Sequence, residues 1–172
     1  MKNLYLFVGL IFFHNFAFSQ DKFLQEASSK WKSATEYTQK VMDSMPQKHY
    51  GYKPMKEEMS FEEQLLHMAN NMNWLGGTYL TSKPAPASVK LEAKGKSRKE
   101  VVQDLNNSLA YIQEILANFD GNKLDETVDF PVGKLSKRQI ITLLSDHHTH
   151  HRAQLLVYLR LKGEKPPAYV GW

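Results

Sequence analysis

The chain has 172 residues, a formal net charge of +4 and no cysteine. The lack of cysteine excludes structural disulfides, thiolate metal sites and a lipoprotein-type cysteine anchor. Lysine and arginine are interleaved with aspartate and glutamate instead of forming one basic stripe, so we expect no nucleic-acid partner even though the isoelectric point is about 9.1.

Residues 1–19 have the pattern of a cleavable signal peptide. Lys2 gives a positive start, an apolar run follows from Leu4 to Phe13, and Ala17-Phe18-Ser19 supplies small residues for cleavage. The apolar run is shorter than the roughly 20 residues of a spanning helix, which favours cleavage over a retained anchor, the alternative. We therefore expect a periplasmic or secreted chain that starts at Gln20 and has no stable membrane anchor.

The remaining residues, 20–172, are enough for one domain with its own core. The first helix is expected from Asp21 to Ser44, because apolar residues recur there at helical spacing and Pro46 forbids continuation. An extended loop, His49-Tyr50-Gly51-Tyr52-Lys53-Pro54, follows it. The chain therefore begins its fold with one long helix and a loop.

Three Ser-led capping boxes predict where the other helices begin. They are Ser60–Glu63, Ser97–Glu100 and Ser136–Gln139. The apolar periodicity after each box predicts helices from Ser60 to between Gly76 and Tyr79, from Ser97 to a stop at Gly121, and from Ser136 to Lys162. Residues 128–132 alternate as a short hairpin would, although Pro131 argues against a strand there. Four helices with moderate loops indicate an all-α four-helix bundle.

The last predicted helix holds four of the seven histidines, within residues 146–154. His147 and His151 are four residues apart and therefore share one helix face. They interrupt an inward stripe formed by Ile140, Leu144, Leu155 and Tyr158. Two buried imidazoles without partners are costly, whereas a divalent metal uses one nitrogen of each. We favour a metal site, and hydrogen bonds across the bundle are the alternative.

The histidines next to this pair are not expected to be metal ligands. His148 and His150 point about 100° to either side of it, which predicts surface groups or groups behind the ligands. A zincin protease needs Glu directly after the first histidine, and His148 stands there, so that class is excluded. Arg152 faces away from the pair and is as easily a structural ion-pair residue as a functional one.

A third ligand must come from another helix, and His67 is the best candidate, although its position also suits a partly exposed helix histidine. His49, in a loop, is a poorer one. Glu63, one turn before His67, is expected either to accept an imidazole N–H or to be solvated. Gln154 borders the same cavity, where it either hydrogen-bonds a water or substrate or packs between helices.

These segments together resemble the DinB/YfiT-like superfamily of helical-bundle metalloproteins. The resemblance covers the mature chain and rests on Tyr52-Lys53-Pro54, residues 59–67, His147 through Gln154 and Gly163-Glu164-Lys165-Pro166-Pro167. It implies an up-up-down-down bundle in which His67, His147 and His151 bind a divalent metal, zinc or nickel. Ala153 stands where the family often has glycine.

Three protein ligands leave a coordination position open, as a catalytic site requires. The leading hypothesis is therefore a metal-dependent hydrolase or transferase of a small molecule, and the resemblance adds thiol-dependent transferases and a maleylpyruvate isomerase as relatives. Gln154, Glu63 and Tyr52 are candidate pocket residues, with no acid or base assigned. One alternative is a non-catalytic metal-binding or ligand-binding bundle, stress-related or structural. Another is a bundle with simply packed histidines. A homodimer is a further expectation.

Overall fold

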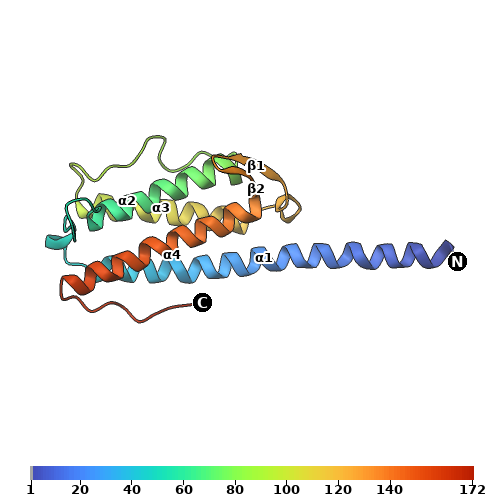
Figure 1. Ribbon diagram of the computed structural model, residues 1–172, viewed down its shortest axis with the longest axis horizontal. Coiled ribbons are helices and arrows are strands. Elements are labelled where there is room, and N and C mark those ends of the chain that lie inside the picture. Colours follow the sequence, from blue (N-terminus) through green and yellow to red (C-terminus); the bar gives the residue numbers. More distant parts are fainter. Residues whose placement is uncertain (1) are drawn as a thin grey trace.

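Four long helices packed side by side make up most of the computed structural model (Figure 1). They are α1 (Lys2–Ser44), α2 (Phe61–Leu75), α3 (Arg98–Ala117) and α4 (Lys137–Leu161). The structure describes the backbone of residues 2–172 and the side chains of residues 22–172. The predicted all-α four-helix bundle is confirmed, and one two-stranded sheet accompanies it.

The predicted signal peptide and its cleavage after Ser19 fall among residues whose side chains lie outside the described ones, as does the predicted helix start at Asp21. The predicted end of the first helix at Ser44 agrees with the end of α1. Within the part of the chain that the structure describes, no helix combines the length and apolar character needed to cross a membrane.

All three predicted capping boxes form. At α2 the Ser60 hydroxyl accepts a hydrogen bond from the Glu63 backbone N–H, and the Glu63 carboxylate accepts one from the Ser60 N–H at 2.6 Å. The same reciprocal pairs begin α3 and α4. Each cap satisfies two amides that the helix leaves free, which is worth about 1 kcal/mol. α2 continues as a π-helical turn, Gly76–Leu80, within the region where the sequence predicts the helix to fade.

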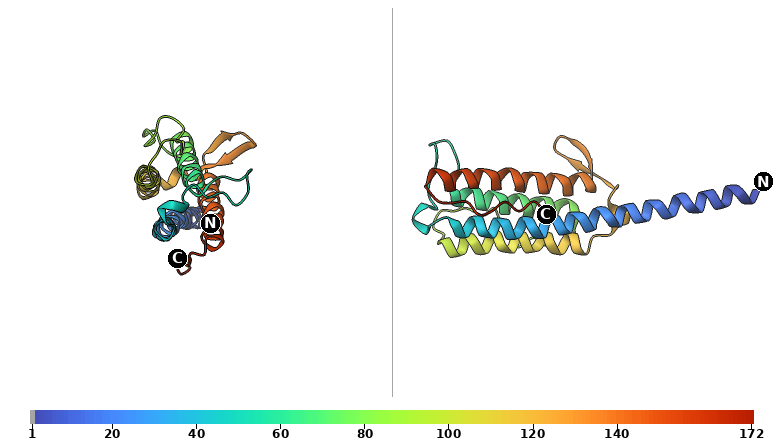
Figure 2. Two further views of the ribbon diagram at one scale, coloured as in Figure 1. Left: turned by 90° about the vertical axis from the view of Figure 1, so that its left-hand side faces the viewer. Right: turned by 90° about the horizontal axis from the view of Figure 1, so that it is seen from below.

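The helices do not run in the expected up-up-down-down order. The Arg138 guanidinium lies over the Phe23 ring and that of Arg152 over the Tyr37 ring, so α1 and α4 are parallel, whereas an up-up-down-down bundle would make them antiparallel. In Figures 1 and 2, α1 and α4 run one way while α2 and α3 run the other, an up-down-down-up order. The long connection between α2 and α3 allows this, because its 17 residues (81–97) can reach back along the whole bundle.

The segment around Pro131 forms a hairpin that is longer than predicted. β1 (Thr127–Phe130) pairs antiparallel with β2 (Gly133–Ser136). Pro131 lies in the turn, where its missing N–H costs no ladder hydrogen bond. The Phe130 ring packs against Trp74, with ring centroids 5.6 Å apart, and so attaches the hairpin to the end of α2.

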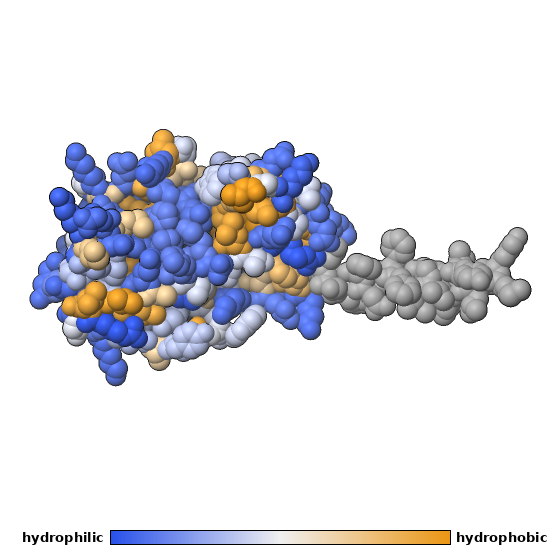
Figure 3. Space-filling model, in the orientation of Figure 1, coloured by the Kyte–Doolittle hydropathy of each residue, from blue (hydrophilic) through white to orange (hydrophobic). Residues whose placement is uncertain are grey.

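The core lies along the whole bundle axis and draws on every helix. Fully buried members include Val41, Leu65, Leu105, Ile112 and Leu155. Hydrophilic side chains cover most of the face shown in Figure 3, in keeping with an apolar interior. Because this core extends well beyond any single site, the fold does not depend on one polar cluster.

Candidate metal centre

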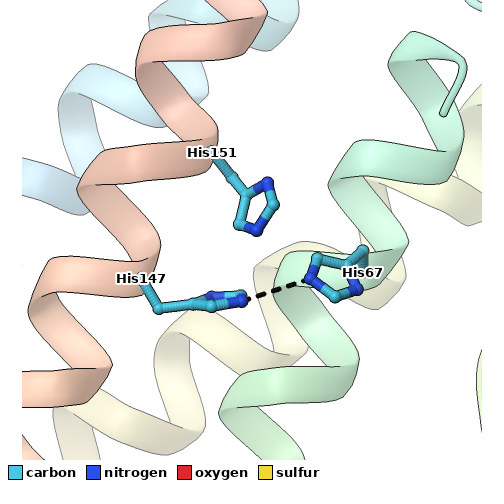
Figure 4. A group of neighbouring side chains, drawn as sticks. All are labelled: His67, His147 and His151. Atoms are coloured by element: carbon cyan, nitrogen blue, oxygen red, sulfur yellow. Dashed lines mark hydrogen bonds between the residues drawn. The ribbon is translucent and has the colours of Figure 1, made fainter. Parts of the chain in front are cut away.

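Three histidines from two helices meet inside the bundle. His67 comes from the middle of α2, and His147 and His151 come from successive turns of α4 (Figure 4). One ring nitrogen of each lies within 4.8 Å of the others, and the Nε2 atoms of His67 and His147 are 3.1 Å apart. Three nitrogens around one zinc ion lie about 3.4 Å apart, so small side-chain rotations suffice to fit a metal.

Gln64 determines which nitrogen His151 offers. Its Oε1 lies 2.6 Å from His151 Nδ1, and an amide oxygen can only accept a hydrogen bond. Nδ1 therefore carries the proton, and the Nε2 lone pair is left for a metal. Gln64 is fully buried and lies one turn before His67 on α2. This partner was missed by the sequence analysis, although a glutamine inside the apolar face of a helix was a readable signal.

All three histidines are held in the neutral form that binds metals. Burial, together with a smaller effect of the neighbouring imidazoles, lowers the pKa of His147 to about 4. Burial also lowers the pKa of His151 to about 4, and burial and the charge of Lys90 lower the pKa of His67. At neutral pH the cluster therefore presents lone pairs in place of protons.

His148 is not a surface group, because it is buried between α4 and α1 with 2% of its surface exposed. Its Nε2 lies 2.7 Å from the Thr38 hydroxyl, which itself donates to the Ala34 carbonyl. His148 must therefore donate, and its ring also packs edge-on against Trp31 at 4.9 Å. The expectation that it is not a ligand agrees with this position. His150 is exposed, as expected.

Arg152 is structural, but no ion pair involves it within residues 22–172. Its guanidinium is 4% exposed and lies 5.0 Å from the centre of the Tyr37 ring. It also donates to the Ala34 carbonyl and the Thr149 hydroxyl, both at 3.4 Å. The ion pair of the structural alternative is replaced by a cation–π contact, because α1 presents an aromatic ring there instead of a carboxylate.

Glu63 is bonded to no imidazole among the described residues, and its side chain is 40% exposed, in agreement with the solvated alternative. Its carboxylate caps α2 and pairs with Lys53 at 2.8 Å, and this hydrogen bond lowers the pKa of Glu63. Tyr52 lies in the loop before α2 and packs against the C-terminal part of α4. Its ring centre is 6.1 Å from that of Tyr158 and 4.6 Å from the Lys162 ammonium. Of these two candidate pocket residues, only Glu63 borders the space beside His67.

Gln154 follows His151 by one turn and is half-buried. Its Oε1 is buried and has no hydrogen-bond partner among the described residues, so the structure leaves both of its predicted roles open. His49 lies in the short 3-10 turn Gln47–His49, outside the three-histidine group. The poorer candidate for the third ligand is therefore set aside.

A pocket of about 320 Å³ opens beside the histidines. His67 forms part of its wall, together with Leu66, Asn70 and the connection between α2 and α3. A larger pocket of about 540 Å³ lies by the π-helical turn and the end of α3, and no histidine lines it. Because chemistry requires reactive groups in the cavity, the smaller pocket is the one that belongs to this site.

The chain is a four-helix bundle with a three-histidine cluster in which His151 is buried and the other two are half-buried. The family model described as the DinB family matches residues 18–171, and the chain belongs to that family. The chain is 26% identical over 142 residues to the uncharacterized protein YjoA of Bacillus subtilis (strain 168), covering 78% of this chain and 88% of that protein.

Solved structures show the same fold. A DinB-like protein from Bacillus cereus ATCC 10987 superposes with a TM-score of 0.70 at 21% identity, covering 87% of this chain and 97% of that one. The DinB-like YjoA structure gives 0.67 at 23% identity, covering 86% and 99%. Similarity at this level supports the bundle fold, and the site must be argued from the residues of this chain.

Proposed function

We propose that this DinB-family protein is a metal-dependent enzyme, a hydrolase or transferase, that acts on a small molecule. The observation that carries the proposal is the meeting of three neutral imidazoles, one of which, His67, also lines a ligand-sized pocket. His67, His147 and His151 would hold the ion, and zinc or nickel suits imidazole nitrogens. When bound, a divalent metal supplies Lewis-acid chemistry that polarises a carbonyl or acidifies a water or thiol.

The other side chains of this site position and shield it. Gln64 fixes the His151 ring and its tautomer from the side away from the cluster. Glu63 and Lys53 pair at the start of α2 and so hold one end of the pocket wall. Gln64, Glu63 and Lys53 thus orient the site and shape its pocket. None of them is assigned as a general acid or base.

A non-catalytic bundle that binds a metal or another ligand is the second candidate function. It is favoured by the pairing of Glu63, the α2 carboxylate in the pocket wall, with Lys53, because this ion pair and the cap of α2 already engage that carboxylate. Chelation separates the two roles. If the metal only stabilised the bundle, its removal would unfold the chain and no substrate would be turned over. Because the core extends along all four helices, we expect the helical circular dichroism to survive chelation.

Metal analysis of the untagged protein tests the proposal. We expect about one zinc or nickel ion per chain, and close to none in His67→Ala, His147→Ala and His151→Ala, because each change removes one of three ligands. His49→Ala is the control, since this histidine lies in the 3-10 turn outside the three-histidine group.

Unchanged metal content in these three single variants would contradict the proposal. No uptake by the wild-type chain, even after incubation with zinc or nickel, would favour simply packed histidines.

We also propose export of the chain to the periplasm or medium, a proposal supported by the leader pattern of residues 1–19. The same preparation tests it, because mass spectrometry of chain produced from the full-length gene should show Gln20 as the first residue. Retention of Met1 would argue against cleavage.

A further inference from the structure

Two lysines and one glutamate line one side of the pocket beside His67, called its roof below. Its roof is the segment 90–94 of the connection between α2 and α3, and its floor is α2. We propose that this pocket binds a small organic anion with an apolar body, and that Lys90 and Lys94 attract the negative end. The inference rests on the proposed function, since it names the substrate class of the same site.

The roof is attached to α2 through one side chain. Asn70 Nδ2 donates to the Leu91 carbonyl at 2.9 Å, and the Leu91 N–H donates to Asn70 Oδ1 at 2.8 Å. This pair of bonds copies the pairing of one strand with another, so the segment cannot slide along the helix. In Figure 1 the connection runs back along the bundle from the end of α2 to the start of α3. The residues around Leu91 are thereby held over the pocket.

The extended roof sorts its side chains by alternation. Leu91 and Ala93 are partly buried and pack against the core, while Lys90, Glu92 and Lys94 are exposed. Leu66 and Met59 add apolar wall from below. A ligand in this space therefore meets carbon surface inside and charge at the mouth, which is an arrangement for an amphipathic molecule.

The charges at the mouth do not cancel. Among the described residues, Lys90 and Lys94 have no ion-pair or hydrogen-bond partner, whereas Glu63 is neutralised by Lys53. Glu92 offsets one of the two lysines, so one positive charge remains. The charge of Lys90 also reaches His67, whose protonated form it disfavours. A positive mouth at the wall of a histidine cluster concentrates anions there.

The volume limits the size of that anion. A pocket of about 320 Å³ is at the lower end of the range for small-molecule sites. Hexanoate fits this description, with one negative end and a short apolar chain. Hexanamide has the same shape and no charge, so a comparison of the two isolates the effect of the lysines.

Binding of the two probes to the mature chain can be followed by NMR of the Leu91 backbone amide and the Asn70 side-chain amide. Titrations are run with zinc-loaded and metal-free protein at low salt. We expect hexanoate to bind at least about tenfold more tightly than hexanamide. Lys90→Gln and Lys94→Gln should each weaken hexanoate binding about threefold, as expected for one exposed charge, and leave hexanamide unchanged. High salt should remove most of the difference.

Lys99→Gln is the control, because Lys99 is an exposed lysine near the start of α3 and outside the pocket. Equal binding of the two probes, wild-type affinity in the double lysine variant, or no perturbation of Leu91 and Asn70 at the solubility limit would overturn the inference. Zinc uptake by the same chain tests the metal site separately. Charge-selective binding by a chain that takes up no zinc would leave the anion pocket standing and sink the metal site.

Discussion

At the scale of single residues, the Gln64 amide orients one of the three histidines without belonging to the cluster. Its oxygen holds the Nδ1 proton of His151, so the ring can present Nε2 to the cluster in one orientation. Partners of this kind raise the basicity of a ligating imidazole and reduce the entropy lost on binding. The orientation of His151 within the cluster therefore depends on a residue that is not one of the three histidines.

The Gln64→Ala variant tests this role. We expect zinc affinity to fall by about 10-fold to 100-fold, the usual cost of losing the partner of a metal-bound histidine. Competition with a chromophoric chelator measures it. Gln103→Ala, an exposed glutamine on α3, should leave the affinity unchanged. Wild-type affinity in Gln64→Ala would show that His151 is oriented by packing alone.

At the scale of elements, α4 buries two faces at once. One face meets α2 and carries His147 and His151, and the other meets α1 and carries His148 and Arg152. The sequence analysis traced a single inward stripe, because helical periodicity marks the centre of an apolar arc and not its width. In a bundle each helix touches two neighbours, so the arc is wider and includes polar residues that satisfy one another.

The π-helical turn after α2 brings the backbone against α3. A Cβ on Gly76 would lie 2.9 Å from Ile112 Cδ1 and 3.0 Å from both Ile115 Cδ1 and Tyr111 Cε1. The missing side chain therefore allows the two helices to approach. At Gly77 the nearest atom, Tyr111 Oη, would be 3.4 Å away, an ordinary contact.

Gly76→Ala should thus lower the free energy of unfolding by about 1–3 kcal/mol, because three packed side chains must move to accept the methyl group. Gly77→Ala is the control and should be neutral or slightly stabilising, since alanine favours helical backbone. Denaturant unfolding measures both. Equal stability of the two variants would mean that the α2–α3 contact relaxes freely.

At the scale of the whole molecule, buried histidines link stability to pH. Burial lowers the pKa of His148 to about 3, below the value of about 6.5 in an unfolded chain. Between these values the unfolded state binds more protons than the folded state, so stability is lost as the pH falls below 6.5. His147 and His151, each with a pKa of about 4, act in the same direction.

The metal-free protein should therefore lose stability on acidification, with about 2 kcal/mol coming from His148 alone between pH 7 and pH 5. Urea unfolding in EDTA at several pH values measures this loss. In His148→Gln the loss should be smaller by that amount, while the exposed control His150→Gln should follow the wild type. Identical pH dependence of His148→Gln and wild type would refute the assignment.

Much of this architecture was readable from local sequence. Three helix starts were predicted from their capping boxes, which begin at Ser60, Ser97 and Ser136. A capping box is completed within four residues and needs no tertiary partner. The i, i+4 spacing of His147 and His151 has the same local character. His67 was the best candidate for a third ligand from another helix, and the family resemblance implied the same residue, although the periodicity of α2 alone left that side chain free to be exposed.

The sequence by itself determined four helices, where three of them begin, and which histidines share a face, because these properties follow from hydrogen bonds and side-chain spacing within one or two turns. Only the tertiary structure decided the direction of the helices, the burial of His148, the partnership of Gln64 with His151 and the roof that Asn70 holds over the pocket. Each of these joins residues at least 21 positions apart, and such contacts exist only once the helices have packed.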